Sequence, residues 1–410
     1  MATEHLPGER HGAYAVTEPL GTDYYDVFAD VTGTDRDAWA RARRVSDDLA
    51  PEMLAAWDAA AYPHERILSA LGSADLLGDG IAHEGLTPMS PLAAGLVNME
   101  LSRVDGSVGT VLAVQGGLAL RTLALYGSDA QKERYLGPLS RGEIPGAFAL
   151  TEPDHGSDST GLETTATAEA GGWVLRGAKK WIGNGASGGI TFVWARIVSP
   201  GDPDDQKVGC FLVPQETPGY RGTVISGKVA LRAIHQAHIA LEDAQLDGSA
   251  RLPGAHSFAD TSRVLFATRS GVAWSALGHA TACYEAALSY ARERIQFGRP
   301  LAGFQLVQER LTRMLSQLTT MQLFCRRLAD LEAAGALRPT QASLAKYTNT
   351  RHARDIAREA RDLLGGNGIL LENRVIQHLA DIEAIHTYEG TESVQALLIG
   401  RDITGVGAFV

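Results

Sequence analysis

The sequence predicts a mainly α-helical protein with a β-domain in its middle, and three observations support this. Apolar residues recur at spacings of three and four in the first third of the chain and again in its last third. Between these regions, β-branched and aromatic runs such as ITFVWARI and VGCFLVP alternate with Gly, Pro and Asp turns, as strands do. The chain of 410 residues is also longer than one compact core usually holds, so two or three packed units are expected.

Changes in sequence texture divide the chain into four expected parts. Residues 1–30 are rich in Gly, Pro and charge and form an N-terminal arm that needs contacts elsewhere for order. Helical stretches such as APEMLAAWDAAA predict an N-terminal helical domain over 31–146, and the strand-like runs predict a middle β-domain over 147–256. Residues 257–410 are a predicted helical bundle, because one apolar stripe repeats at about 3.5 residues. The stripe comprises Val307, Leu311, Met314, Leu318, Met321, Cys325 and Leu328.

Composition and charge narrow the kind of protein. The formal net charge of −11 argues against a general nucleic-acid binder, although a few local Arg and Lys could still hold a phosphorylated ligand. The three cysteines, Cys210, Cys283 and Cys325, form no CxxC pair, which is typical of a reducing compartment. We find neither a secretory signal nor an apolar run approaching the ~18 residues that a membrane span needs. The expected protein is cytoplasmic, with no nucleic-acid and no membrane partner.

Four segments could carry chemistry: FALTEPDHGSD (148–158), KKWIGNG (179–185), ERIQFGRPLAGFQ (293–305) and LLGGNGI (363–369). Each also has an ordinary structural interpretation when taken alone. The first is compatible with a strand that ends in an Asx-type turn, and the second with an Asn-Gly turn. The third could be a helix that stops at a glycine, and the fourth a tight turn between helices. The histidines show no metal-ligand spacing, so no metal site is expected.

Taken together with YEGT (388–391), these segments change the interpretation. In this order and in this helix–strand–helix layout, the chain resembles the acyl-CoA dehydrogenase family from about Asp23 to its C-terminus. Within the family it is most similar to the branch of the short-chain acyl-CoA oxidases and glutaryl-CoA dehydrogenase. The resemblance implies an N-terminal helical domain, a middle β-barrel and a C-terminal four-helix bundle. It also implies bound FAD, a homotetramer or dimer, a role in fatty acid metabolism, and dehydrogenation of an acyl-CoA thioester to the trans-2-enoyl thioester.

The resemblance further implies which residues bind the cofactor and the substrate. TEPDHGSD would cradle the flavin, W-I-x-N would lie at its edge, and RxQFG and LGGNG would hold the pyrophosphate and adenine, partly across a subunit boundary. The implied cofactor-binding residues are Phe148, Ala149, Leu150, Thr151, Ser157, Trp181, Ile182, Gly183, Arg294, Gln296, Phe297, Gln305, Asp362, Gly365, Gly366 and Thr391. The implied substrate-binding residues are Ser157, Arg269, Tyr388, Gly390 and Gly109.

Glu389 is the expected catalytic base. Desaturating the α,β-bond of a thioester requires removal of a weakly acidic α-proton while hydride leaves the β-carbon, which needs a positioned carboxylate. Burial by substrate and flavin would raise the pKa of such a glutamate toward that of the carbon acid. The hydride would pass to flavin N5, because no side chain accepts two electrons. The alternative for Glu389 is a first-turn carboxylate favoured by a helix dipole, a role that Glu392 suits better.

Two positions depart from the family pattern. Gly109 stands where the glutaryl-CoA branch has an arginine for the distal carboxylate of its substrate, so a neutral, short acyl chain is expected. Gly183 stands where most dehydrogenases of the family carry Thr or Ser beside the flavin, and a glycine is expected to open space there. The electron acceptor therefore stays open between an electron-transferring flavoprotein and O2. The thioester carrier stays open between CoA and acyl carrier protein, and a flavin monooxygenase or a binding protein without turnover are more distant alternatives.

Overall fold

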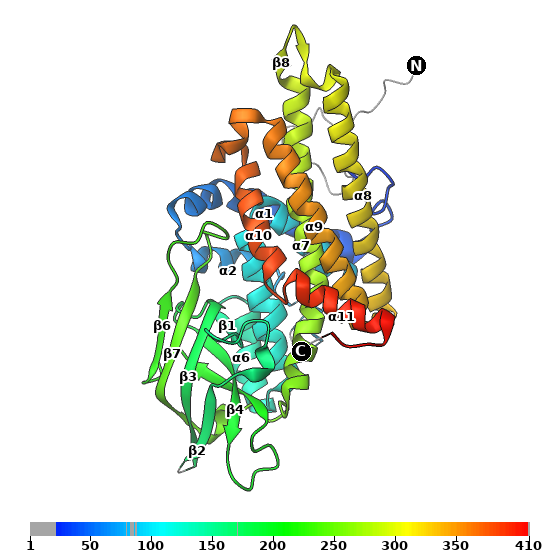
Figure 1. The fold of residues 1–410 in the computed structure, drawn as a ribbon. Coiled ribbons are helices and arrows are strands. Elements are labelled where there is room, and N and C mark those ends of the chain that lie inside the picture. Colours follow the sequence, from blue (N-terminus) through cyan, green and yellow to red (C-terminus); the bar gives the residue numbers. More distant parts are fainter. Residues whose placement is uncertain (1–21, 79, 83–85, 87, 170, 409–410) are drawn as a thin grey trace.

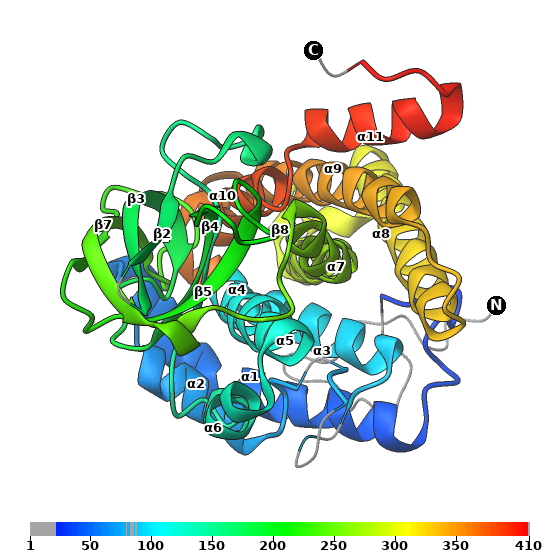
Figure 2. The ribbon, with the colours of Figure 1, turned by 90° about the horizontal axis from the view of Figure 1, so that it is seen from below.

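The molecule is built along one long helix, α7 (Phe258–Glu293). A computed structural model describes residues 22–78, 80–82, 86, 88–169 and 171–408. Figure 1 shows a curled sheet beside one end of α7 and a short hairpin at the other end. In Figure 2, α7 lies at the centre of the molecule, between the N-terminal helices and the other C-terminal helices.

The N-terminal helices form a layer against α7. They are α1 (Gly33–Ala59), α2 (His64–Ser73), α3 (Pro91–Val104), α4 (Gly106–Leu112), the π-helical η1 (Ala113–Leu120), α5 (Arg121–Tyr126) and α6 (Asp129–Ser140). Two glycines let α3 and α7 approach closely. A Cβ at Gly95 would lie 2.2 Å from the Trp274 ring, and one at Gly278 would lie 2.3 Å from the carbonyl oxygen of Met99. A larger residue at either position would push the two helices apart.

The middle of the chain forms a curled sheet of seven strands. They are β1 (Gly146–Ala149), β2 (Thr165–Glu169), β3 (Gly172–Gly183), β4 (Ile190–Val198), β5 (Val208–Pro214), β6 (Tyr220–Val224) and β7 (Gln236–Asp247). The order is β1-β4-β2-β3-β7-β6, with β5 also paired to β4. β1 and β2 run parallel to β4, and the other pairs are antiparallel.

Side chains of β4 alternate between two cores. Phe192 and Trp194 pack with residues of η1, α5 and α6, which places one face of the sheet on the N-terminal helices. Val193 and Ala195 pack with residues of β3 and β7 inside the curl. Both faces of the strand are therefore buried, as its nearly continuous apolar sequence indicates.

The C-terminal part is a four-helix bundle with one further helix on its outside. After α7 come β8 (Ile295–Gln296), β9 (Arg299–Pro300), α8 (Gln305–Ala333), α9 (Pro339–Leu363), α10 (Val375–Thr387) and α11 (Glu392–Thr404). Single 3-10 turns occur at Ser159–Gly161, Gly248–Ala250, Leu301–Gly303, Gly365–Ile369 and Leu371–Asn373. The predicted stripe of α8 faces the core, since its members from Leu311 to Leu328 are buried and Val307 is partly buried. The order of helices, curled sheet and bundle confirms the predicted fold class.

Residues 22–30 are the described part of the expected N-terminal arm, and they pack on α8. The Arg326 guanidinium donates to the carbonyl oxygen of Val27 (3.1 Å) and to the Asp30 carboxylate (2.5 Å). The Phe28 ring packs against the rings of Trp39 and Trp274. This segment therefore takes its order from the adjacent α1 and from α7 and α8, which lie far away in the sequence.

One helical stretch among the described residues is long and apolar enough to cross a membrane by length and composition. Gly106–Tyr126 has 21 residues. Its most apolar 18-residue stretch has a mean hydropathy of 1.5, and 67% of that stretch is buried inside the protein. It packs against β1 and α7. Such burial is what the central helix of a packed core shows.

A buried ion pair ties β3 to the segment after β1. The Lys179 ammonium lies 2.9 Å from the Glu152 carboxylate and 3.0 Å from the carbonyl oxygen of Leu150, and neither side chain is more than 5% exposed. Glu152 also accepts the backbone N–H groups of Glu163 (2.7 Å) and Thr164 (2.9 Å). Burial alone would raise the pKa of Glu152, but Lys179 and these donors outweigh it and lower the pKa to about 2. For Lys179, burial is the larger effect and lowers the pKa to about 8.

The variant Lys179→Met should lower the free energy of unfolding by about 3–5 kcal/mol, because it leaves a carboxylate buried without its partner. Chemical denaturation of the purified protein measures this loss. Lys207→Met is the control, since the Lys207 side chain is 52% exposed and its ion pair with Asp204 should contribute at most about 1 kcal/mol. Equal stability of the two variants would contradict a structural role for the buried pair.

Candidate active site

A short loop between α10 and α11 carries the expected base. Glu389 has a left-handed backbone (φ 56°), and Gly390 follows with φ 85°. Thr391 then caps α11 through its side chain. Glu389 therefore lies outside the first turn of α11. The helix-start carboxylate is Glu392, which pairs with Arg351 at 2.8 Å.

The Glu389 carboxylate is partly buried and faces a hydroxyl and two cations. The Thr268 hydroxyl on α7 donates to its Oε2 at 2.8 Å. Burial raises the pKa of Glu389, and the Thr268 hydrogen bond and the charges of Lys346 and Arg269 oppose that rise. The carboxyl group is thus partly shielded from water, while its partners favour the ionised form, and both are properties of a general base.

The backbone on both sides of Glu389 is held by two side chains. Lys346 on α9 donates to the carbonyl oxygens of Tyr388 and Gly390. Gln395 on α11 donates to the carbonyl oxygens of Glu389 (3.1 Å) and Gly390 (3.0 Å). Gly390 has φ 85° and a Cβ there would lie 2.5 Å from the Gln395 amide nitrogen, so a side chain at this position would strain the turn.

Arg269, an expected contact of acyl-CoA, lies beside the base. Its Nη1 donates to the Ser343 hydroxyl at 3.2 Å, whereas its buried Nε has no hydrogen-bond partner among the described residues. Burial lowers the pKa of this guanidinium, and the nearby Glu389 opposes that effect. An unsatisfied buried N–H group next to the base is available to a ligand.

One face of the α4–η1 helix joins the base loop to the sheet. The phenol of Tyr388 lies near the hydroxyls of Thr110 and Ser275, which lower its pKa against the larger effect of burial. One turn further along the helix, Val114 touches the end of β3, where a Cβ on Gly183 would lie 3.0 Å from Val114 Cγ2. Thr110 and Val114 are four residues apart, or about 6 Å along the helix axis. The base loop and the expected flavin strand are therefore neighbours.

At the end of β3, the Trp181 ring faces solvent, and the space beside Gly183 is occupied. The register of β3 against β7 shifts between Lys179 and Ile182, and Trp181 within this bulge has φ 65° and a ring 52% exposed. Ile182 is buried in the core of the sheet. The space expected beside Gly183 is filled by Val114.

The segment after β1 can reach a ligand mainly through its backbone. The side chains of Phe148, Ala149 and Leu150 are buried in the protein. Thr151 is partly buried, and Ser157 is exposed on the following loop.

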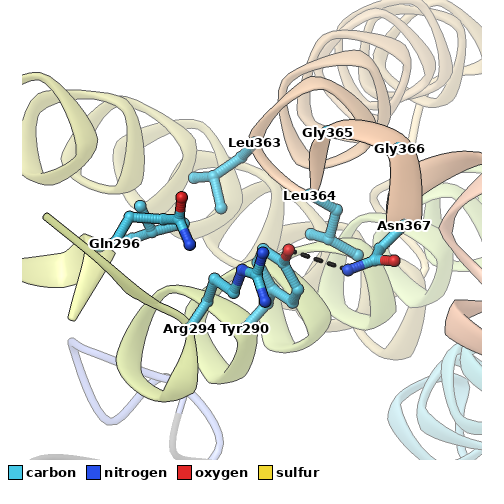
Figure 3. A pocket seen from close by; sticks show the side chains of 9 residues that line it. Tyr290, Arg294, Gln296, Leu363, Leu364, Gly365, Gly366 and Asn367 are labelled. Carbon is cyan, nitrogen blue, oxygen red and sulfur yellow. Dashed lines mark hydrogen bonds between the residues drawn. The ribbon is translucent and has the colours of Figure 1, made fainter.

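Other expected cofactor residues gather at the far end of α7, around the cavity in Figure 3. Its lining residues are Tyr290, Arg294, Gln296, Leu301, Leu363, Leu364, Gly365, Gly366 and Asn367. The Arg294 guanidinium and the side-chain amides of Gln296 and Asn367 can donate hydrogen bonds. Within the described part of the chain, no atom comes within 4 Å of a Cβ placed on Gly365 or Gly366. Cationic and amide donors beside bare backbone suit a phosphate-bearing group.

Three further expected residues lie near this cavity. Phe297, between β8 and β9, is 93% exposed, and Gln305 is exposed at the start of α8. Asp362 accepts a hydrogen bond from Arg310 at 2.9 Å, so its carboxylate is engaged within the chain.

The structure does not bring the two groups of expected cofactor residues together within one chain. Thr268, beside the base, and Tyr290, in the distal cavity, lie on α7 about 22 residues apart, or about 33 Å. Figure 1 shows the sheet at one end of this helix and β8 at the other.

Comparisons with known proteins agree with this architecture. Models of the acyl-CoA dehydrogenase N-terminal, middle and C-terminal domains match residues 34–143, 147–244 and 258–404. The mitochondrial short-chain specific acyl-CoA dehydrogenase of Homo sapiens is 32% identical over 332 residues, which is 80% of each chain. A glutaryl-CoA dehydrogenase structure from Mycobacterium smegmatis is 38% identical, with a TM-score of 0.89 over 93% of this chain and 97% of the other. Another from that species, in complex with FADH2, is 34% identical, with a TM-score of 0.90 over 97% and 100%.

The chain belongs to the acyl-CoA dehydrogenase family. It is an acyl-CoA dehydrogenase, an FAD-dependent oxidoreductase, as the sequence predicts. Two features fit FAD: a half-exposed indole at the end of β3 for an aromatic ring system, and the donor-lined glycine cavity for phosphates. Which individual residues touch FAD stays a prediction.

Sequence reasoning did not single out three residues of this site, Thr268, Lys346 and Val114. Lys346 carries a signal, because it lies beside Ala345 on the stripe of α9 that faces the core, where lysine is rare. Thr268 directly precedes the expected substrate contact in FATRSG. Val114 has no sequence signal, because its role arises from contact with a strand far along the chain.

The variant Thr268→Val should move the ionisation midpoint of Glu389 to higher pH. It removes a hydrogen bond to the charged form worth roughly 1.5–3 kcal/mol, so the protonated form becomes more stable relative to the carboxylate. The infrared carboxyl band, assigned by its loss in Glu389→Gln, reports this midpoint. Thr281→Val is the control, because the Thr281 hydroxyl donates to the Leu277 carbonyl oxygen of its own helix. An unchanged midpoint in Thr268→Val would show that this hydroxyl does not tune the base.

Proposed function

We propose that the enzyme desaturates a short, uncharged acyl-CoA at its α,β-bond, with Glu389 as the base. The carrying observation is the partly buried carboxylate of Glu389, oriented by Thr268 and flanked by Lys346 and Arg269. Its oxygen takes the α-proton of the thioester. FAD, when bound, accepts the hydride from the β-carbon, which leaves the trans-2-enoyl thioester.

The surrounding residues keep the base effective. Tyr388 packs against the helical cores on one side of Glu389 and excludes water from it. A substrate bound over the loop would remove the remaining water and make the carboxylate a stronger base. Thr268 and the two cations oppose this rise in pKa and so favour the ionised form that takes the proton.

The pocket chemistry supports an uncharged acyl group. A Cβ on Gly109 would lie 2.2 Å from the Ser102 hydroxyl, so this position has no room for a side chain that could bind a distal carboxylate. The two cations that act on Glu389 are held near it, Arg269 by Ser343 and Lys346 by the loop carbonyl groups. A dicarboxylic acyl chain would then enter without a cation of its own. The human relative is named as short-chain specific, which agrees with the proposed length of the acyl chain.

For the electron acceptor, we propose an electron-transferring flavoprotein. Val114 fills the position next to Gly183, which supports a closed surface beside the flavin strand. The second candidate is O2, favoured by the absence of a side-chain hydroxyl at Gly183. CoA is the proposed carrier because the relatives are named for CoA thioesters.

A homotetramer is the proposed assembly, acting in fatty acid metabolism in the cytoplasm. The distance of about 33 Å along α7 supports it, because the glycine cavity can then serve the FAD of a neighbouring subunit. The exposed side chains of Ile295 (53%) and Phe297 (93%) beside the cavity offer apolar surface for such a contact.

The variant Glu389→Gln should keep its yellow FAD but lose bleaching by butyryl-CoA, with a rate lower by roughly 10²–10⁴ or more. Anaerobic stopped-flow absorbance of the flavin measures this. Glu392→Gln is the matched control, because that carboxylate lies three residues on and pairs with Arg351. Bleaching of Glu389→Gln at the wild-type rate would refute the assignment of the base.

A substrate panel tests the proposed acyl group and acceptor. Butyryl-CoA should bleach the flavin, and glutaryl-CoA should bleach it at least about tenfold more slowly, because the dicarboxylate lacks a cation. Admission of air should then reoxidise the enzyme slowly compared with addition of an electron-transferring flavoprotein. Equal rates with both thioesters would overturn the uncharged-acyl proposal, and reoxidation by air within seconds would favour the oxidase.

A further inference from the structure

Lys346 is a buried cation that binds backbone groups. It is 1% exposed and lies between Ala345 and Asn349 on the inner face of α9. Within the described residues it has no carboxylate at ion-pair distance, and its ammonium donates to the carbonyl oxygens of Tyr388 and Gly390. Carbonyl groups compensate a buried charge only in part, so an apolar residue here would cost less. The cost suggests a role beyond packing.

The two carbonyl groups stand on either side of Glu389. This residue has φ 56°, a conformation that costs a non-glycine residue roughly 1–3 kcal/mol and persists only when its surroundings hold it. From α9, Lys346 holds the carbonyl groups of the residues before and after Glu389. From α11, Gln395 holds the carbonyl group of Glu389 itself. The direction of the carboxylate toward Thr268 follows from this backbone.

We infer that Lys346 is a positioning residue for the base: its ammonium fixes the Tyr388–Gly390 backbone that aims Glu389, and its charge favours the ionised carboxylate. This inference rests on the proposed role of Glu389. Lys346 acts on the carboxylate through the loop and through its field, and the α-proton goes to Glu389 alone.

Titratable groups from three elements face Lys346. They are Glu389 on the loop, Arg269 on α7 and His386 on α10. Burial lowers the pKa of Lys346 to about 7, with Glu389 raising it and Arg269 lowering it. The ammonium is therefore present at lower pH and is lost as the pH rises through about 7. On the acid side kcat/KM should fall as Glu389 becomes protonated. On the alkaline side it should fall by a limb of at most about tenfold, because the neutral amine loses its charge but can still donate to both carbonyl oxygens.

Two variants separate hydrogen bonding from charge. Lys346→Gln can still donate from its amide but carries no charge, whereas Lys346→Met keeps the length of the chain and does neither. The holoenzymes are compared by FAD content, by the pH profile of flavin reduction with butyryl-CoA, and by the infrared midpoint of Glu389. Lys207→Gln, on the exposed surface, is the control.

In Lys346→Gln, the infrared midpoint and the acid limb should both move to higher pH, because a nearby positive charge has been removed, and the alkaline limb should disappear. The optimal rate of Lys346→Gln should stay within about tenfold of the wild type. The optimal rate of Lys346→Met should fall by at least about 100-fold, because the carboxylate of Glu389 is then no longer held in position.

An unchanged midpoint and pH profile in Lys346→Gln would overturn the charge role, and Lys346→Met matching Lys346→Gln in rate would overturn the positioning role. If Lys346→Met fails to retain FAD, the midpoint and pH profile of Lys346→Gln still decide the charge role. An optimal rate of Lys346→Gln more than about tenfold below the wild type would then contradict the positioning role. These failures are distinct from failure of the proposed function, which shows in Glu389→Gln. Persistent bleaching there refutes the base, whereas its loss together with wild-type behaviour of both Lys346 variants refutes only this inference.

Discussion

The constraint on which the site depends is the partial burial of one carboxylate beside two cations. Removing Glu389 from water makes its charge costly, and the low local dielectric makes Thr268, Lys346 and Arg269 effective in return. These partners come from two helices, α7 and α9, so the bundle must be assembled before the base has its environment. The chemistry of the loop is thus a property of the packed core.

The central helix α7 is the frame for this arrangement. It supplies Thr268 and Arg269 to the base and Ser275 to the phenol of Tyr388, and it ends beside the distal cavity. Its close contact with α3, which Gly95 and Gly278 allow, leaves little freedom for the two helices to slide. Groups on a packed helix keep their positions better than groups on loops. The one loop that carries chemistry is accordingly tied to α9 and α11 on both sides.

The two regions that fit FAD lie at opposite ends of the same helix. The sheet end offers an exposed indole and neighbours the base through Thr110 and Val114, and the hairpin end offers Arg294 beside two bare glycines. Under the proposed assembly, each subunit would contribute its near end to its own site and its far end to a neighbour. Protein association and cofactor binding would then stabilise each other, since a ligand that binds only the assembled form shifts the equilibrium toward it.

Local patterns in the sequence were sufficient for the order of helices, sheet and bundle, because hydrophobic period and turn chemistry act over a few residues. The sequence also assigned the helix-start role to Glu392 in preference to Glu389, and α11 indeed begins at Glu392 behind its Thr391 cap. The partners of the base belong to the tertiary structure alone: Thr268 is 121 residues from Glu389, and Lys346 is 42 residues from Tyr388. The filled space beside Gly183 likewise required the contact with Val114. Burial and electrostatic field are sums over neighbours in space, and a chain read in order does not contain those neighbours until it folds.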